Sequence, residues 1–239
     1  MSGAELRHRI GEQLKRSVSA RFTPDFSDTG NSGQALPKLP RLSDGLPALS
    51  SDKWLLQEWR DIAERARSGR IKLLGVEWPG VSGKDKWALD PVTGNRWPDS
   101  AYCFKIPYRH TPHMGDVKYV WELNRLQYLQ PVAALAAITK NTELAHFCAN
   151  EIESWIDSNP PFEGVNWASG IELACRIVSI LTVVSIIGDD AFNTAQCKKI
   201  QTSLAIHGYW LMRYPSRYSS ANNHLIAEAG GLFLLGSLA

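Results

Sequence analysis

The sequence predicts an all-α protein built as an array of antiparallel helix hairpins. From Asp116 onward, apolar residues recur almost without interruption at the period of an α-helix. The connections between these segments are short, as in "KNT" and "GDD", and short connections make consecutive helices antiparallel neighbours. A chain of 239 residues is long enough for one large domain with a substantial core.

The first fifty residues differ from the rest of the chain. Residues 1 to about 20 predict a basic amphipathic helix, and residues 23–50 are rich in Pro, Gly, Ser and Asp, which is typical of an extended arm. We therefore divide the chain into a basic, flexible N-terminal arm, 1–50, and a helical domain, 51–239.

A helix and an irregular region open the domain. The stretch "SDKWLLQEWRDIAERARSG" predicts a helix with Ser51 or Asp52 as its N-cap and Gly69 as its stop. From Arg70 to Pro112 the helical period is lost. "IKLLGVEW" predicts a short strand and "DPVTGNRWPDS" is turn chemistry, so we expect one or two short strands here.

Five helices follow, and their expected bounds are about 116–138, 142–157, 166–187, 190–211 and 222–238. Asp189 or Asp190 is the expected N-cap of the fourth helix, and Asn222 that of the fifth.

The first, third and fifth of these helices each begin with a cluster of polar and aromatic residues. The clusters are Trp121, Glu122, Asn124, Arg125 and Tyr128; Asn166, Trp167, Ser169, Glu172 and Arg176; and Asn222, Asn223, His224 and Glu228. If neighbouring helices alternate in direction, these three N-terminal ends lie on one side of the array. Free N–H groups and the positive ends of the helix dipoles would converge there, which suits an anionic ligand such as a carboxylated sugar.

Each cluster also has a purely structural interpretation. Glu172 and Arg176 are four residues apart and Glu122 and Arg125 three apart, which is the spacing of surface salt bridges on a helix. A lone histidine in a helix is more often structural than catalytic, and an Asn at a helix start is usually a cap. The recurrence at equivalent ends of alternate helices favours the functional interpretation.

Several function classes have no support in the composition. The net charge of +2, with both signs interspersed, gives no argument for nucleic acid or for an anionic membrane surface. The apolar runs are too short to span a bilayer, and Cys148 and Cys175 lie in apolar helical patterns typical of reduced core thiols. His110 with His113 is a weak pair, so we expect no metal and no cofactor.

The stretches "GDVKYVWELNR", "NPPFEGVNWASGIELACR" and "ANNHLIAEAGGL", with "TGNRWP" upstream, resemble the heparinase II/III-like polysaccharide lyases, which include alginate and oligoalginate lyases. The resemblance covers roughly residues 70–239. It implies an (α/α) toroid followed by a β-sandwich domain, and β-elimination on a polysaccharide that contains uronic acid. The implied partner is therefore an anionic polysaccharide or oligosaccharide.

The resemblance also implies roles for individual residues. Asn223 would stabilise the uronate carboxylate, and His224 would be the neighbouring acid/base or carboxylate-binding residue. An amide suits the first role because it donates hydrogen bonds to developing negative charge without ionising itself. The implied substrate-binding residues are Trp121, Glu122, Asn124, Arg125, Asn166, Trp167, Glu172, Arg176, Asn222 and Glu228.

The family's catalytic tyrosine and a further histidine would lie beyond Ala239, and "LFLLGSLA" ends inside an apolar helix. We therefore expect a truncated N-terminal portion of the toroid, inactive alone, whose partner is the C-terminal part of the same protein. The N-terminus lacks an apolar secretory segment, which predicts a cytoplasmic or cell-associated bacterial protein, with a periplasmic location as the alternative from the family.

Two other functions remain open at this stage. An (α/α)-toroid glycoside hydrolase would need two carboxyl groups across a cleft, for which Glu122, Glu172 and Glu228 are candidates. A non-catalytic helical carbohydrate-binding module would be typical of hairpin arrays, although no fixed repeat period is visible.

Overall fold

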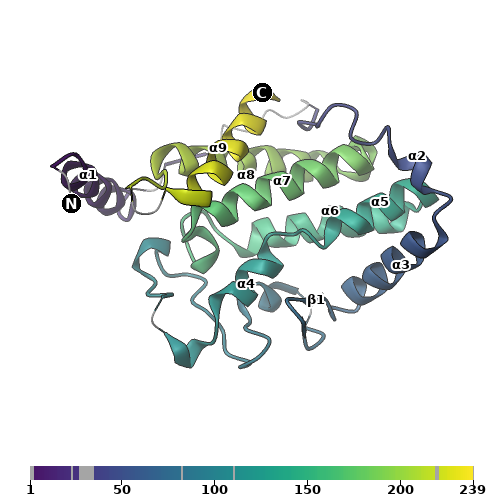
Figure 1. Cartoon of the computed structure of the whole chain (residues 1–239), viewed down its shortest axis with the longest axis horizontal. Helices are drawn as coiled ribbons and strands as arrows, with labels where there is room; N and C mark the ends of the chain where they lie inside the picture. The colour runs from purple at the N-terminus through teal and green to yellow at the C-terminus, as the bar shows by residue number, and fades with distance from the viewer. Residues whose placement is uncertain are drawn as a thin grey trace.

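The computed structural model confirms the all-α class. The structure describes residues 3–22, 24–26, 35–81, 83–109, 111–218 and 221–238. Helices α5 (Leu129–Thr139), α6 (Thr142–Ser158), α7 (Gly170–Ile187) and α8 (Thr194–Arg213) run along the long axis of the molecule (Figure 1). Helix α9 (Asn222–Ser237) packs on α7 and α8. Closure of this array into a toroid stays a prediction.

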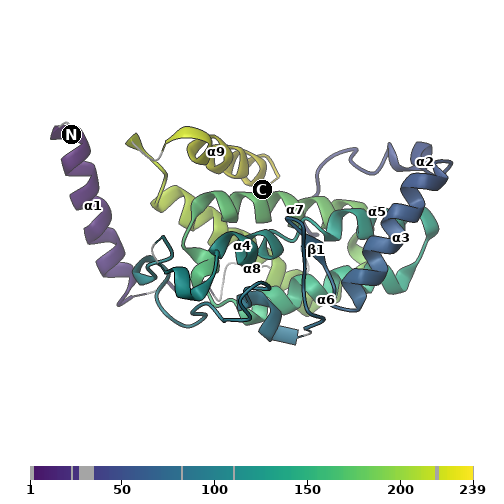
Figure 2. The same cartoon turned by 60° about the horizontal axis from the view of Figure 1, so that its bottom comes forward.

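The N-terminal region forms separate pieces around this array. The predicted amphipathic helix is α1 (Gly3–Ser19), which stands at one end of the molecule (Figures 1 and 2). Residues 35–39 contact α7 and α8: the backbone N–H of Leu39 donates to Ser185 Oγ at 2.8 Å, and Gln201 donates to the Ala35 carbonyl at 3.4 Å. They lead to α2 (Leu46–Leu49) and α3 (Lys53–Arg67), and Asp52 caps α3 as predicted by accepting from the Leu55 N–H.

The irregular region between α3 and α4 contains one small hairpin. Strands β1 (Lys72–Leu73) and β2 (Val76–Glu77) pair antiparallel. Leu74 and Gly75 between them have φ angles of 50° and 78°, which is the turn that matches the twist of a two-residue hairpin. The same region contains the short 3₁₀ helices η1 (Gly83–Ala88), η2 (Cys103–Lys105) and η3 (Pro112–Met114). Two more precede later helices: η4 (Val165–Trp167) lies before α7, and η5 (Asp189–Ala191) lies before α8.

The first long helix of the array is interrupted, contrary to the prediction of one helix over 116–138. Helix α4 (Val117–Asn124) ends before Leu126, whose φ of 60° is left-handed and incompatible with a continuous α-helix. Helix α5 then starts at Leu129. The apolar period continues through the break, so periodicity alone could not reveal it.

Two of the predicted helix caps are wrong. Helix α8 begins after Asn193, which forms a reciprocal capping box with Gln196, whereas Asp189 and Asp190 lie in η5. Helix α9 has Ala221 as its N-cap and Asn222 as its first residue, with a φ of 27°. The start of α9 therefore has no side-chain cap.

Helix α7 forms the centre of the core. In the parts of the chain that the structure describes, it alone is long and apolar enough to cross a membrane, but 67% of it is buried inside the protein. Burial by α5, α8 and α9 explains its uniform hydrophobicity, because a helix that is covered on most sides needs no polar face.

Candidate functional site

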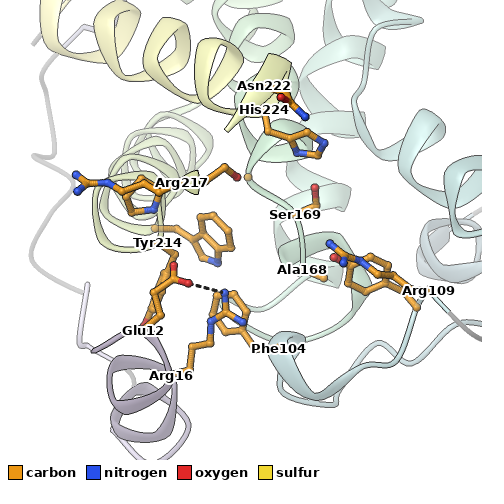
Figure 3. Close-up of a pocket in the computed structure, with 15 residues that line it drawn as sticks. Glu12, Arg16, Phe104, Arg109, Ala168, Ser169, Tyr214, Arg217, Asn222 and His224 are labelled. Carbon is orange, nitrogen blue, oxygen red and sulfur yellow. Dashed lines mark ion pairs between the residues drawn. The ribbon is translucent and has the colours of Figure 1, made fainter. Parts of the chain in front are cut away.

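A cavity lies where the start of α7, the end of α8 and the start of α9 meet (Figure 3). Its volume is about 380 Å³, and it adjoins a second cavity of about 370 Å³ that shares several lining residues with it. Helix α1 closes the side opposite α9. The described lining residues of the larger cavity are Glu12, Arg16, Phe104, Tyr108, Arg109, Ala168, Ser169, Gly170, Trp210, Tyr214, Pro215, Ser216, Arg217, Asn222 and His224.

The lining of this cavity carries an excess of positive charge. Arg16, Arg109 and Arg217 line it together with His224, and Glu12 is the one carboxylate among the described lining residues. Guanidinium groups bind carboxylates through two parallel N–H donors, so this composition suits an acidic ligand.

Arg16 joins helix α1 to the opposite wall. Its guanidinium lies over the Phe104 ring, 4.4 Å from the centroid, and 3.7 Å from Glu12 Oε2 (Figure 3). Arg16 Nε is buried, and no hydrogen-bond partner for it occurs in the described part of the structure.

Two uncapped helix starts contribute to the cavity. Ser169 and Ala221 are the N-caps of α7 and α9, and neither accepts a hydrogen bond from its helix through a side chain. Gly170 and Asn222, the first residues of the two helices, line the cavity. The helices thus bring the positive ends of their dipoles to the same arginine-rich space.

Glu228 holds these two helix starts in place. This predicted site residue is 1% exposed and accepts from both the N–H and the Oγ of Ser216, each at 2.7 Å. Its carboxylate also packs against Gly170, where an added Cβ would lie 2.2 Å from Oε1. Glu228 therefore acts on the cavity through its neighbours Ser216 and Gly170.

Arg176 ties the predicted residues of the core together. It is fully buried, and its guanidinium donates to the backbone oxygens of Asn124 and Asn166 and contacts His207 Nε2 at 3.1 Å. It also stacks 4.0 Å from the centre of the Trp155 ring. Burial lowers the pKa of Arg176 to about 9.

The amides of Asn124 and Asn166 also face the protein interior. Both donate to the backbone oxygen of Trp87, and Asn124 accepts from Trp155 Nε1. Trp167 is likewise buried and donates to the Asn159 carbonyl. These side chains fix α4 and η4 on α6 and α7, and none of them lines the cavity.

Glu122, Arg125 and Glu172 form an ion-pair cluster between α4 and α7. Arg125 donates through two nitrogens to Glu172, at 2.7 and 3.1 Å, and through a third to Glu122 at 2.7 Å. The hydrogen bonds that Arg125 donates to Glu172 raise the pKa of Arg125 above its usual value. The structural interpretation of the sequence, an ion pair between Glu172 and Arg176 within α7, is replaced in the described structure by this pair between Glu172 and Arg125.

Trp121 does not line the cavity itself but packs against a residue that does. Its Nε1 donates to the Val165 carbonyl, and its ring packs edge-on against Tyr108, with centroids 5.1 Å apart. Tyr108 lines the cavity. Helix α4 thus supports the cavity wall, although its own N-terminal residues do not line it.

Ser169, Asn222 and His224 are the residues of the predicted clusters that line the cavity directly, while Asn223 is exposed and outside the lining. Sequence reasoning missed the cavity's arginines. Arg217 lies in "RYPSRYSSAN" and Arg109 in "PYRHTPH", which are polar loops. The basic residues of these loops were the one signal in the sequence that could have indicated a cationic site. Arg16 is about 150 residues or more from the α7 and α8–α9 segments that it faces, so no local pattern could place it there.

Metal ligands do not gather in the described parts of the chain, where no group of three His, Cys, Asp or Glu side chains is placed to hold an ion. His113 is exposed, and His110 lies outside the described residues. The described cysteines are free thiols; Cys148 is buried and Cys175 partly so.

Similarity to known proteins supports the lineage that the motifs indicated. No curated protein and no solved structure matches the chain. A family model described as the heparinase II/III N-terminus matches residues 90–239, which is more than half of the chain and includes α4 to α9. The chain therefore belongs to the heparinase II/III N-terminal family.

Proposed function

We propose that the chain supplies the uronate-binding part of a polysaccharide lyase that acts by β-elimination. The observation that carries this proposal is the cavity lined by Arg16, Arg109 and Arg217, into which the start of α9 brings His224. The family membership supports a polysaccharide as the ligand, and the positive lining supports an acidic one.

The chemistry of elimination requires such a lining. The proton to be removed lies on the carbon next to the carboxylate, and an ionised carboxylate makes that carbon a very weak acid. Arginine forks and uncapped helix N–H groups stabilise the negative charge that develops on the carboxylate oxygens as the proton leaves. We assign His224, which lines the cavity, to proton transfer or carboxylate binding, following the family. Asn223 is exposed beside it and outside the lining, so its assignment to this stabilisation rests on the family alone.

The reaction is balanced without water. A base takes the proton from C5 of the uronate, the C5–H electrons form the C4–C5 double bond, and the C4–O bond breaks. An acid returns a proton to the leaving glycosidic oxygen. One glycosidic bond is thereby replaced by one unsaturated uronate end and one hydroxyl end.

The carboxylates of the structure argue against the alternative of a glycoside hydrolase. That reaction needs two carboxyl groups facing each other across the substrate. Glu122 and Glu172 are engaged by Arg125, and Glu228 is buried against Ser216. Glu12 alone lines the larger cavity among the described residues, and it pairs with Arg16.

The test is an elimination assay on a panel of uronic-acid polysaccharides, made with the chain joined to the C-terminal part that the family resemblance implies. A C4–C5 double bond conjugated to the carboxylate absorbs in the near ultraviolet, so the proposal predicts a rising absorbance. Asn223→Ala and His224→Ala should abolish the increase, whereas the control His146→Ala, at an exposed histidine on α6, should leave it unchanged. New reducing ends without absorbance would contradict elimination and favour a hydrolase. Uronate binding with neither signal would limit the chain to a binding role.

A further inference from the structure

Helix α1 packs on the protein with its polar face. His8, Glu12 and Arg16 line the two adjoining cavities, and Ser19 Oγ lies 2.6 Å from the Tyr102 hydroxyl and accepts from Tyr214 at 2.7 Å. These positions recur every three to four residues and so share one side of the helix. The other side of α1 points away from the body.

That outer side carries an apolar stripe. Leu6, Ile10, Leu14 and Val18 are spaced four residues apart and are 47–63% exposed, and Phe22 just beyond the helix is 75% exposed. An amphipathic helix of a globular protein normally buries such a stripe and exposes its polar side. In α1 the arrangement is reversed, so the stripe is available to something outside the molecule.

The charge of the segment distinguishes between possible occupants. Residues 3–22 contain five Arg and Lys against two Glu, which gives this segment a net charge of +3. The whole chain carries +2, so the rest of the chain is slightly negative. Arg7 and Arg21 are exposed. Pairing two copies of α1 along the stripe would bring two +3 segments together, whereas an anionic surface would be attracted.

We propose that α1 binds in the interfacial plane of an anionic lipid bilayer. Helices of this type have low overall hydrophobicity, insert a narrow apolar face at the boundary between headgroups and acyl chains, and use Arg and Lys to contact anionic headgroups. The long arginine side chains can reach the headgroups while their stems stay on the apolar surface. The rest of the chain then stands on the aqueous side, with its cavity behind α1.

This proposal does not depend on the lyase function, because its readout is lipid binding. The intact chain is sedimented with vesicles of phosphatidylcholine alone and with vesicles that also contain phosphatidylglycerol. We expect binding to the anionic vesicles, weaker binding at higher salt, and at least tenfold weaker binding to the neutral ones. Arg7→Gln and Arg21→Gln should each lower the partition coefficient about fivefold.

The apolar stripe is tested by the double variant Ile10→Ser, Leu14→Ser, which should lose vesicle binding. The side chains of Ile10 and Leu14 are exposed, so their replacement should leave the protein folded, and circular dichroism can check this. The matched control is Leu74→Ser, at an exposed leucine in the β1–β2 turn, which should bind like the wild type. Absence of binding to anionic vesicles, or binding that the double variant retains, would overturn the proposal. A concentration-dependent dimer that the double variant abolishes would instead assign the stripe to a second copy.

Discussion

At the scale of single residues, Arg176 shows how this protein uses a buried cation. It has no carboxylate within salt-bridge distance among the described residues, and instead satisfies carbonyl oxygens from two other segments and the ring of His207. The planar guanidinium can serve several acceptors in fixed directions at once, which a lysine cannot do.

We expect Arg176→Ala to lower the free energy of unfolding by roughly 3 kcal/mol or more, because it leaves several buried acceptors without donors. Arg176→Lys should restore little of this loss. The control Arg217→Ala, at an exposed residue, should change stability by no more than about 0.5 kcal/mol. Chemical denaturation measures all three, and a mild effect of Arg176→Ala would contradict the described network.

His207 gives a prediction for the pH dependence of stability. Burial and the neighbouring Arg176 lower its pKa from 6.5 to about 3, so the folded protein keeps the ring neutral. Below pH 6.5 the unfolded chain binds a proton that the folded chain does not. Stability should therefore fall from pH 6.5 towards pH 3, by up to about 1.4 kcal/mol per pH unit from this group.

The variant His207→Gln isolates this contribution, because glutamine offers a neutral acceptor to Arg176 and does not titrate. Denaturation between pH 7 and 4 should show a shallower acid loss for the variant than for the wild type. Equal slopes would mean that His207 is protonated in the folded state as well.

The sequence predicted which residues near the site are polar but not what they contact. The spacing of Glu172 and Arg176 fits an ion pair within one helix, yet Glu172 binds Arg125, the C-cap of α4. Side chains four residues apart on a helix can always meet, whereas a partner from another helix depends on packing that local spacing does not specify. The same reason explains why Asn124 and Asn166 support the core.

At the scale of elements, the close approach of α9 to α7 positions His224. An added Cβ on Gly231 would lie 3.3 Å from both Cα and Cβ of Ala174, whereas one on Gly230 would meet no atom within 4 Å. Both glycines are in the helix, where alanine is intrinsically favoured.

We therefore expect these adjacent substitutions to differ in sign. Gly230→Ala should raise the free energy of unfolding by about 0.5–1 kcal/mol through helix propensity. Gly231→Ala should lower it by about 1 kcal/mol, because α9 must move away from α7. Thermal unfolding compares the pair directly, and equal gains would show that α9 is not tightly seated.

Most helices could be predicted because their signals are local. The helix starts at Asp52 and Asn141 follow capping rules that involve three neighbouring residues. The break at Leu126 and the cap at Asn193 were missed, since the apolar period continues through the first and an acidic pair precedes the second. Local rules thus predict the existence of a helix more reliably than the residue at which it begins.

At the scale of the whole molecule, the cavity joins segments from both ends of the chain. The sequence indicated that the starts of alternate helices converge, and the starts of α7 and α9 do line one cavity. It could not indicate that α1 would supply the opposite wall. The packing of α1 at the end of α8 depends on contacts almost 200 residues apart, such as Lys15 with the Arg213 carbonyl and Ser19 with Tyr214.

The cavity arginines should govern ligand affinity. Arg109→Ala and Arg217→Ala should each weaken the binding of a uronate oligosaccharide about tenfold, because each removes a charge-assisted hydrogen bond. The matched control Arg67→Ala, at the last residue of α3 and outside the lining of both cavities, should have no effect. Equal losses in all three variants would indicate non-specific attraction to positive charge.

The central claim is that the cavity recognises the carboxylate of a sugar, and calorimetric titration tests it most directly. The chain is titrated with a uronate oligosaccharide and with the same oligosaccharide after its carboxyl groups are reduced to alcohols. The account predicts binding of the first and at least about tenfold weaker binding of the second. Equal affinity for the two sugars, or no binding of the uronate, would contradict it.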